Sequence, residues 1–402
     1  MPGLKIFIIS NGCDRRMLDA SRLEEYFRVN GCSLIKTPER ADYIVFVTCA
    51  FTGAKEQDCF RILSKYSRLK GKLVILGCLP GIAPERLNKE FNGLVCLKTE
   101  DLGEIDGIFQ DFKVKIQEIA ESNNLFRDIP LINKMMTKLE PTADFIYKCI
   151  ITARYKMKNP GSSINCSRNR KGVYLRIGWG CPMNCSYCAI RSAVGPLRSK
   201  APEECFREYE ALLHAGQRSF IITADNAGAY GLDIGSSFSE LLDGLSRIDT
   251  GHEVSWIISE LHPVWMIRYR DSLLKNIEKN KITEILCSVQ TGSDRISKLM
   301  NRETSSADMR KTLRLFRDAN DRLELILDVI IGFPTETDED FMESLDLICK
   351  AGASHVNFFA YSDREKTVAS GLSGKTGIPD IHRRLRIAMK ILGKKKIDLL
   401  YL

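Results

Sequence analysis

The sequence predicts an α/β protein in which a small parallel α/β sheet domain precedes a partial (β/α)6 barrel. Three observations lead to this prediction. Apolar, β-branched segments alternate with helical segments through about the first hundred residues, and the alternation resumes near residue 171. Cysteines or polar residues follow directly after most of the apolar segments. Consecutive strand–helix–strand units form parallel sheets, and ligands bind at the carboxyl ends of their strands.

Length and charge limit the class of protein. The 402 residues suggest two or three domains with ample apolar content for a core. The net charge of +8 permits an anionic partner without requiring one, because 51 acidic residues are interspersed with 59 basic ones. No apolar run could span a bilayer and no secretory signal opens the chain, so we expect no membrane partner and a cytoplasmic location.

Three predicted strands organise the first domain: residues 4–10, 43–47 and 72–76. Helical patterns follow them at residues 19–30, 52–69 and 81–92. Each strand ends, within three residues, in a cysteine: Cys13, Cys49 and Cys78. Because parallel strands end at one crevice, we expect these thiols to converge there and to hold an iron–sulfur cluster. Cys59, in the middle of a predicted helix, has no reason to reach that crevice.

The alternation weakens between residues 99 and 171. Residues 111–120 and 131–139 are predicted to be helical, and residues 155–170 are basic and rich in Asn, Ser and Gly. We therefore predict three parts, which are an N-terminal domain, a helical and basic linker, and a barrel domain. Their boundaries are residues 1–110, 111–170 and 171–402.

A second group of cysteines lies on the loop that leaves the predicted strand 173–177: Cys181, Cys185 and Cys188. Thiolates are the ligands that iron–sulfur clusters and zinc prefer. A structural zinc site needs a fourth protein ligand, and residues 189–196 contain neither His nor Cys. A four-iron cluster with one iron left open by the protein is therefore favoured over zinc.

The remaining chain repeats the strand–helix unit. Strands are predicted at residues 173–177, 219–223, 253–258, 284–289, 324–331 and 355–359. Helices are predicted at residues 202–215, 238–248, 265–279, 306–319, 338–351 and 383–400, the last of them basic. Polar and glycine residues gather where the strands end, as they do at barrel active sites, and include Asp225, Gln290 and Gly332.

These motifs resemble those of a known family. The spacing Cys181-x-x-x-Cys185-x-Tyr187-Cys188 resembles the signature of the radical S-adenosylmethionine (SAM) superfamily. More specifically, the chain resembles the methylthiotransferases that act on tRNA and ribosomal protein. Its N-terminal cluster segments are similar to Gly12-Cys13, Val47-Thr48-Cys49 and Gly77-Cys78. Its barrel motifs are similar to residues 290–294, 300–302 and 328–337, and the resemblance covers about residues 4–392.

The resemblance implies two [4Fe–4S] clusters and SAM as cofactors. The Cys181/Cys185/Cys188 cluster would reduce SAM with an electron from an external one-electron donor, and the resulting radical would attack an unactivated C–H bond. Tyr187 would pack near the adenine, and Asp225, Gln290 and Gly332 would complete the SAM pocket. The Cys13/Cys49/Cys78 cluster would carry the sulfur of the methylthio group. No acid or base is assigned, and the following histidines are interpreted as structural: His214, His252, His262 and His355.

Two departures from the family bear on the substrate. The family usually ends in a small β-barrel domain that contacts the substrate, whereas this sequence stops at Leu402 after the basic helix. The family's arginine-rich stretch after the central cysteines is replaced by residues 190–198. Both favour a peptide or protein side chain over tRNA adenosine, which stays open as the alternative. Another radical SAM sulfur insertion, or a non-catalytic iron–sulfur or zinc protein that binds RNA, stays open as well.

Overall fold

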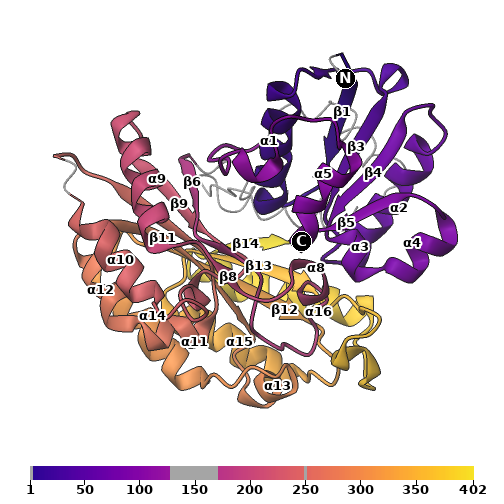
Figure 1. Ribbon diagram of the computed structural model, residues 1–402. Coiled ribbons are helices and arrows are strands. Elements are labelled where there is room, and N and C mark those ends of the chain that lie inside the picture. Colours follow the sequence, from indigo (N-terminus) through magenta and orange to yellow (C-terminus); the bar gives the residue numbers. More distant parts are fainter. Residues whose placement is uncertain (1–2, 127–170, 249–250) are drawn as a thin grey trace. The chain divides into compact units, whose positions relative to one another are not determined.

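The computed structural model describes residues 3–126, 171–248 and 251–402 (Figure 1). These residues form two compact units. The first unit contains residues 3–126, 179–183 and 188–196, and the second contains residues 171–178, 184–187 and the described residues from 197 onward. The predicted helix at residues 131–139 and the basic segment 155–170 lie outside the described residues. The three-part boundaries at residues 110 and 170 stay predictions.

A five-stranded parallel sheet forms the centre of the first unit (Figure 1). Its strands, in the order β2-β1-β3-β4-β5, are β1 (Lys5–Ser10), β2 (Ser33–Leu34), β3 (Tyr43–Thr48), β4 (Lys72–Gly77) and β5 (Val95–Lys98). Strands β1, β3 and β4 confirm the three predicted ones. The parallel pairing of β1 with β3 and of β3 with β4 makes these three strands end side by side.

Helices cover both faces of this sheet (Figure 1). They are α1 (Asp14–Val29), α2 (Gly53–Tyr66), α3 (Leu79–Ile82), α4 (Pro84–Glu90) and α5 (Ile105–Ile108). Alternate residues of β1 point to opposite faces, so Ile8 packs with Phe27 of α1 while Phe7 packs with Phe60 of α2. The predicted helix at residues 111–120 is wrong. Only Ile116–Glu118 forms a 3₁₀ turn, because the apolar residues around it spread into the core next to α1.

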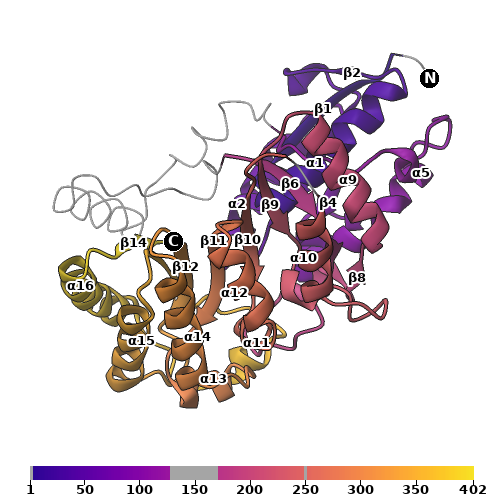
Figure 2. The ribbon, with the colours of Figure 1, turned by 90° about the vertical axis from the view of Figure 1, so that its left-hand side faces the viewer.

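A seven-stranded parallel sheet forms the second unit, with helices along its outer side (Figures 1 and 2). Its order is β14-β13-β12-β11-β10-β9-β6. The strands are β6 (Val173–Arg176), β9 (Ser219–Thr223), β10 (Ser255–Leu261), β11 (Ile282–Gln290), β12 (Glu324–Ile331), β13 (His355–Ala360) and β14 (Asp398–Tyr401). All six predicted strands are confirmed, and the partial barrel gains β14 at one edge.

The helices of the second unit follow its strands in sequence. They are α9 (Pro202–His214), α10 (Phe238–Arg247), α11 (Pro263–Arg268), α12 (Arg270–Glu278), α13 (Asp294–Leu299), α14 (Ser306–Ala319), α15 (Asp338–Ala351) and α16 (Ile378–Lys394). The predicted helix 265–279 is interrupted at Tyr269, where α11 ends and α12 begins. Two short strands and one short helix lie near the central cysteines: β7 (Gly178–Trp179), α8 (Arg191–Val194) and β8 (Arg198–Ser199). None of the described helices is long and apolar enough to cross a bilayer.

The end of the chain differs from the prediction. The helix expected at residues 383–400 stops at Lys394, and Lys396 adopts a left-handed φ of +57° that a helix cannot continue through. Residues 398–401 then pair with β13 as a parallel strand. Leu399 and Tyr401 are buried there. Pairing with the sheet is favoured because it removes from water apolar side chains that would be exposed at the end of a basic helix.

Candidate functional site

The three N-terminal cysteines converge in the first unit. Cys13 is the N-cap of α1, Cys49 follows β3 directly, and Cys78 is the N-cap of α3. The side chain of Cys49 is in hydrogen-bonding contact with both Cys13 and Cys78. Cys49 and Cys78 are buried. The structure therefore brings together three thiols that are separated by up to 65 positions in the sequence, at the shared end of three neighbouring strands.

A glycine allows this approach. Gly77 ends β4 with a φ of +103°, and a Cβ atom there would lie 2.5 Å from the carbonyl oxygen of Thr48. Any other residue at position 77 would push the end of β4 away from the end of β3. The Gly77-Cys78 pair thus brings the Cys78 thiol beside Cys49.

The thiols of Cys13, Cys49 and Cys78 are the type of ligand that an iron–sulfur cluster requires. Hydrogen bonding with the Cys49 thiol and burial raise the pKa of the Cys13 thiol well above its usual value, whereas a bound metal ion would favour the thiolate. Soft thiolates and the positive N-terminus of α1 suit an anionic iron–sulfur cluster. Thiols in mutual contact must move apart to surround one, and no group of three or more His, Cys, Asp or Glu side chains in the described ranges is already arranged as a metal site. The three cysteines fit a cluster in chemical type and in their place at neighbouring strand ends, and the distances between their thiols would have to increase.

The expectation that Cys59 stays away from this crevice is wrong. Its Sγ atom lies 3.4 Å from the carbonyl oxygen of Cys49 and accepts a hydrogen bond from Asn11 Nδ2 at 3.2 Å. The Asn11 Oδ1 atom in turn accepts the backbone N–H of Cys49 at 2.9 Å. Cys59 reaches this point because α2 turns the face that carries Cys59 and Phe60 toward the sheet. Asn11 and Cys59 thus bind the backbone N–H and the backbone carbonyl oxygen of Cys49, respectively.

The central cysteine loop carries residues of both compact units. Cys181 and Cys188 belong to the first unit, and Cys185 belongs to the second. Within the first unit, the backbone N–H of Cys181 donates to the carbonyl oxygen of Gly195 at 3.3 Å. A Cβ atom on Gly180, whose φ is +76°, would lie 1.9 Å from the Pro196 carbonyl oxygen, so only glycine fits before Cys181.

Within the second unit, residues 299–302 form a turn that binds the loop around Cys185, and we name this turn the cradle. The backbone N–H of Ser186 donates to Met300 O at 2.9 Å, and its hydroxyl donates to Leu299 O at 2.7 Å. Asn301 Nδ2 donates to Asn184 O at 2.7 Å. The sequence identified residues 300–302 only as a motif, and the structure shows that they hold the cysteine loop.

The four predicted SAM-binding residues are all in the second unit. Tyr187 is half-buried and packs against an apolar cluster that includes Met300 and Phe333. Asp225 follows β9, Gln290 ends β11 and Gly332 follows β12, so these three lie at carboxyl ends of strands of one sheet. Their contact with SAM stays a prediction.

Gln290 has two properties typical of a ligand site. Its φ of +66° is left-handed, which costs free energy for a non-glycine residue and is common at binding sites. Its buried Oε1 atom has no hydrogen-bond partner among the residues that the structure describes. Buried polar atoms are almost always paired, so this oxygen is available to a bound donor group.

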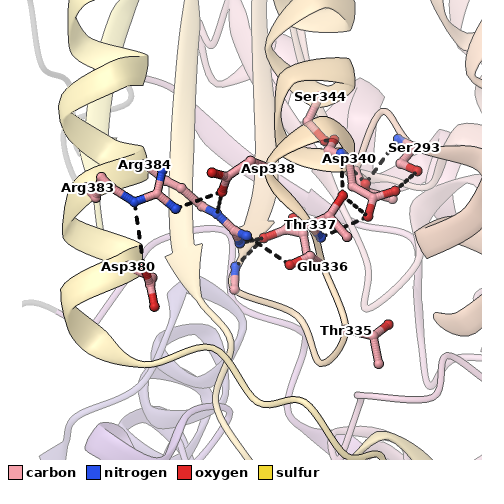
Figure 3. A network of polar contacts seen from close by, with 12 residues as sticks. Ser293, Thr335, Glu336, Thr337, Asp338, Asp340, Ser344, Asp380, Arg383 and Arg384 are labelled. Carbon is pink, nitrogen blue, oxygen red and sulfur yellow. Dashed lines mark hydrogen bonds and ion pairs between the residues drawn. The ribbon is translucent and has the colours of Figure 1, made fainter.

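Polar contacts fix the loops that follow β11 and β12 (Figure 3). Asp340 at the start of α15 accepts hydrogen bonds from the Ser293 hydroxyl at 2.6 Å and from the Thr337 backbone at 2.9 Å. The backbone N–H of Gly292 donates to the Ser344 hydroxyl at 2.8 Å. The two motifs at residues 290–294 and 328–337 therefore form one hydrogen-bonded network at the end of the sheet.

Glu336 connects this network to α16 (Figure 3). Its Oε2 atom accepts the backbone N–H of Gly332 at 2.7 Å and Arg384 Nη1 at 2.6 Å. Burial raises the pKa of Glu336 to about 7, although Gly332 and Arg384 act in the opposite direction. Arg384 also donates to Asp338 at 3.0 Å. The left-handed turn at Gly332 is thus held by the buried contact between Glu336 and Arg384.

The raised pKa of Glu336 predicts a pH dependence of stability. The folded protein keeps a proton on Glu336 up to about pH 7, whereas the unfolded chain releases it near 4.5. Stability should therefore fall as the pH rises from about 5 to 7, by at most about 3 kcal/mol. Thermal melts of the wild type and of Glu336→Gln measure this, and the variant should lack this part of the slope. Glu343→Gln, at an exposed acid on the neighbouring helix α15, is the control and should keep the wild-type slope. Parallel slopes in all three proteins would contradict the prediction.

Comparison with known proteins finds similar proteins for both units. The model of the radical SAM superfamily matches residues 175–348, and the model of uncharacterized protein family UPF0004 matches residues 5–97. A probable threonylcarbamoyladenosine tRNA methylthiotransferase of Pyrococcus abyssi is 26% identical, over 99% of this chain and 88% of that protein. The ribosomal protein uS12 methylthiotransferase RimO of Clostridioides difficile is 28% identical, over 92% of this chain and 78% of that protein.

The chain is similar to the radical SAM methylthiotransferases over nearly its whole length. This similarity implies SAM and a [4Fe–4S] cluster as cofactors. Solved structures agree on the fold. The radical SAM methyltransferase TsrM of Kitasatospora setae has a TM-score of 0.56 at 13% identity, over 89% of this chain and 75% of that one. The cobalamin-dependent SAM radical enzyme OxsB has a TM-score of 0.55 at 14% identity, over 98% and 56%. Identities this low show a shared fold alone.

Proposed function

We propose that this methylthiotransferase-family enzyme uses two clusters and places a methylthio group on an unactivated carbon of a peptide or protein side chain. The two-cluster part is supported above all by the contact of the Cys49 thiol with Cys13 and Cys78. Three cysteines that are far apart in the sequence are unlikely to meet by chance at the ends of three neighbouring strands. Together with the central loop, this makes two sets of three thiols.

Each group of residues has a distinct task. Cys181, Cys185 and Cys188 hold the first cluster, and Cys13, Cys49 and Cys78 hold the second. When bound, these clusters supply one-electron reduction of SAM and a carrier for the transferred sulfur. Tyr187 would pack near the adenine of SAM, and Asp225, Gln290 and Gly332 would complete the SAM pocket from the strand ends. The electron comes from an external low-potential donor. No side chain has to act as an acid or base.

The preference for a protein substrate is supported by the residues that follow the central cysteines. Between positions 189 and 198 only Arg191 and Arg198 are basic, and both are exposed. RNA binding depends strongly on Lys and Arg contacts to phosphates, so a stretch with two cations favours a peptide. The second candidate is tRNA adenosine, which is favoured by the relative from Pyrococcus abyssi. A cytoplasmic location stays a prediction.

Mass spectrometry decides the substrate class. The reconstituted protein is incubated with SAM and dithionite, once with candidate peptides and ribosomal proteins and once with tRNA. The proposal expects a protein side chain to gain one sulfur atom and one CH₂ group. A methylthio adenosine in the tRNA sample, with no modified protein, would select the second candidate. A gain of sulfur without the CH₂ group would indicate another sulfur-insertion reaction.

The contacts around Cys49 predict an effect on the second cluster. Loss of groups that orient a metal ligand typically weakens metal binding about 10–100-fold. Asn11→Ala and Cys59→Ala should therefore each lower iron retention at the N-terminal site by about that factor against a competing chelator. Cys96→Ala is the control, because Cys96 packs against the same core as Cys59 and lies within β5, where it pairs with Ile75. Equal iron retention in all four proteins would show that these contacts do not orient Cys49 for a cluster.

A further inference from the structure

Arg302, the last residue of the cradle, is 3% exposed and contacts the central loop. Its Nη1 atom lies 3.6 Å from Cys185 Sγ and 3.0 Å from the Tyr187 hydroxyl oxygen. Its Nη2 atom donates to the carbonyl oxygen of Ser288 in β11. The guanidinium is therefore fixed on one side by the sheet and directed on the other side at a predicted cluster ligand.

These contacts leave the charge of Arg302 without an obvious counter-ion. Within the part of the chain that the structure describes, its side chain bonds to a thiol, a phenol and a carbonyl, and none of these is a carboxylate. A buried arginine is normally paired, because removing its charge from water is costly. The buried Arg384 of the same unit shows the usual solution, because its guanidinium contacts the carboxyl groups of both Asp338 and Glu336. A thiolate that ligates an anionic cluster would pair Arg302 in the same way.

We propose that Arg302 is a positioning residue that supplies the counter-charge of the first cluster through Cys185 and so raises the reduction potential of that cluster. The inference rests on the proposed function, since it requires a cluster on Cys181, Cys185 and Cys188. The step concerned transfers one electron from a low-potential reductant such as dithionite to the cluster, and no bond is formed or broken. A nearby cation stabilises the reduced state, which carries the additional negative charge.

The test uses the full chain with Cys13, Cys49 and Cys78 replaced by alanine, so that only the first cluster is observed. Arg302→Gln removes the charge, Arg302→Lys keeps it, and Asn301→Gly removes a neutral cradle contact. Glycine suits position 301, where φ is +54°. Redox titration followed by electron paramagnetic resonance should show a lower potential in Arg302→Gln, by at least a tenfold change in the reduction equilibrium, which is about 59 mV. Arg302→Lys should keep most of the potential, and Asn301→Gly, which leaves the charge in place, should shift it far less than Arg302→Gln does.

The outcomes separate charge from packing. Loss of the cluster in Arg302→Gln alone, with unchanged circular dichroism and with both other variants loaded, also supports the proposal. An unchanged potential in loaded Arg302→Gln would overturn it. Equal loss of the cluster, or an equal shift of its reduction potential, in all three variants would also overturn the proposal, because the cradle would then act only by packing. The chain in which only Cys13, Cys49 and Cys78 are replaced should bind one cluster. If it binds no iron, the proposed function and this inference are both overturned, a result that the Arg302 variants cannot produce.

Discussion

Cys185→Ala is expected to reduce the cleavage of SAM under dithionite to the level of buffer alone. Cys185 is one of three thiols in the central loop, and a cluster held by two of them would lose a ligand that the cradle and Arg302 hold in position. Without a stable cluster there is no path for the electron to SAM, so no product of any kind should form. The measurement is the amount of deoxyadenosine released, quantified by liquid chromatography.

Cys205→Ala is the matched control for this experiment. Cys205 is a buried cysteine of α9 in the same unit, and its thiol has no motif spacing that suggests a ligand. This variant should cleave SAM at the wild-type rate. Wild-type cleavage by Cys185→Ala would show that the central loop does not hold the reducing cluster.

Cys49→Ala is expected to separate the two halves of the reaction. Its thiol contacts those of Cys13 and Cys78, so its loss removes the middle ligand of the second cluster. The central loop keeps all of its ligands, and SAM cleavage should continue. Methylthiolated product should fall below detection by mass spectrometry, because no sulfur is held for transfer.

The control for Cys49→Ala is Cys32→Ala, at a cysteine of the same unit that packs at the edge of the core next to α1. It should form product at the wild-type level. Methylthiolated product from Cys49→Ala would contradict the assignment of the sulfur-carrying cluster to the N-terminal cysteines. Loss of SAM cleavage in this variant would show instead that the N-terminal thiols support the first cluster.

Much of the fold could be predicted because its central strands are long and apolar. Strands β1, β3 and β4 each contain five or more residues of a clear pattern, and the cysteine after each marks where it ends. Strand β2 has two residues and β5 has four, so neither differs enough from a loop in the sequence. Strand β14 could not be predicted for another reason. It follows a run of lysines that continues the helical pattern of α16.

The convergence of Cys13, Cys49 and Cys78 could be predicted from topology alone. Neighbouring parallel strands must end at one edge, and this needs no knowledge of side-chain contacts. The positions of Cys59 and Arg302 could not be predicted, since each depends on which helix face or turn packs against the site. Cys59 lies mid-helix in the sequence as well as in the structure, yet the packing of α2 brings its sulfur to the Cys49 carbonyl.

The candidate SAM site illustrates the same limit. The strand ends at Asp225, Gln290 and Gly332 follow from the periodicity of the sequence. The left-handed backbone of Gln290 does not, because glutamine carries no signal for a positive φ. The sequence also identified residues 328–337 as a motif without showing that Glu336 and Arg384 form a buried pair behind Gly332.

Iron and sulfide counting after anaerobic reconstitution tests the two-cluster account most directly. The wild type should hold about eight iron atoms and about eight sulfides per chain, as two [4Fe–4S] clusters require. Cys49→Ala and Cys185→Ala should each hold about four, and the two variants should lose different clusters by their spectra. A wild type with about four iron atoms, unchanged by Cys49→Ala, would contradict the account.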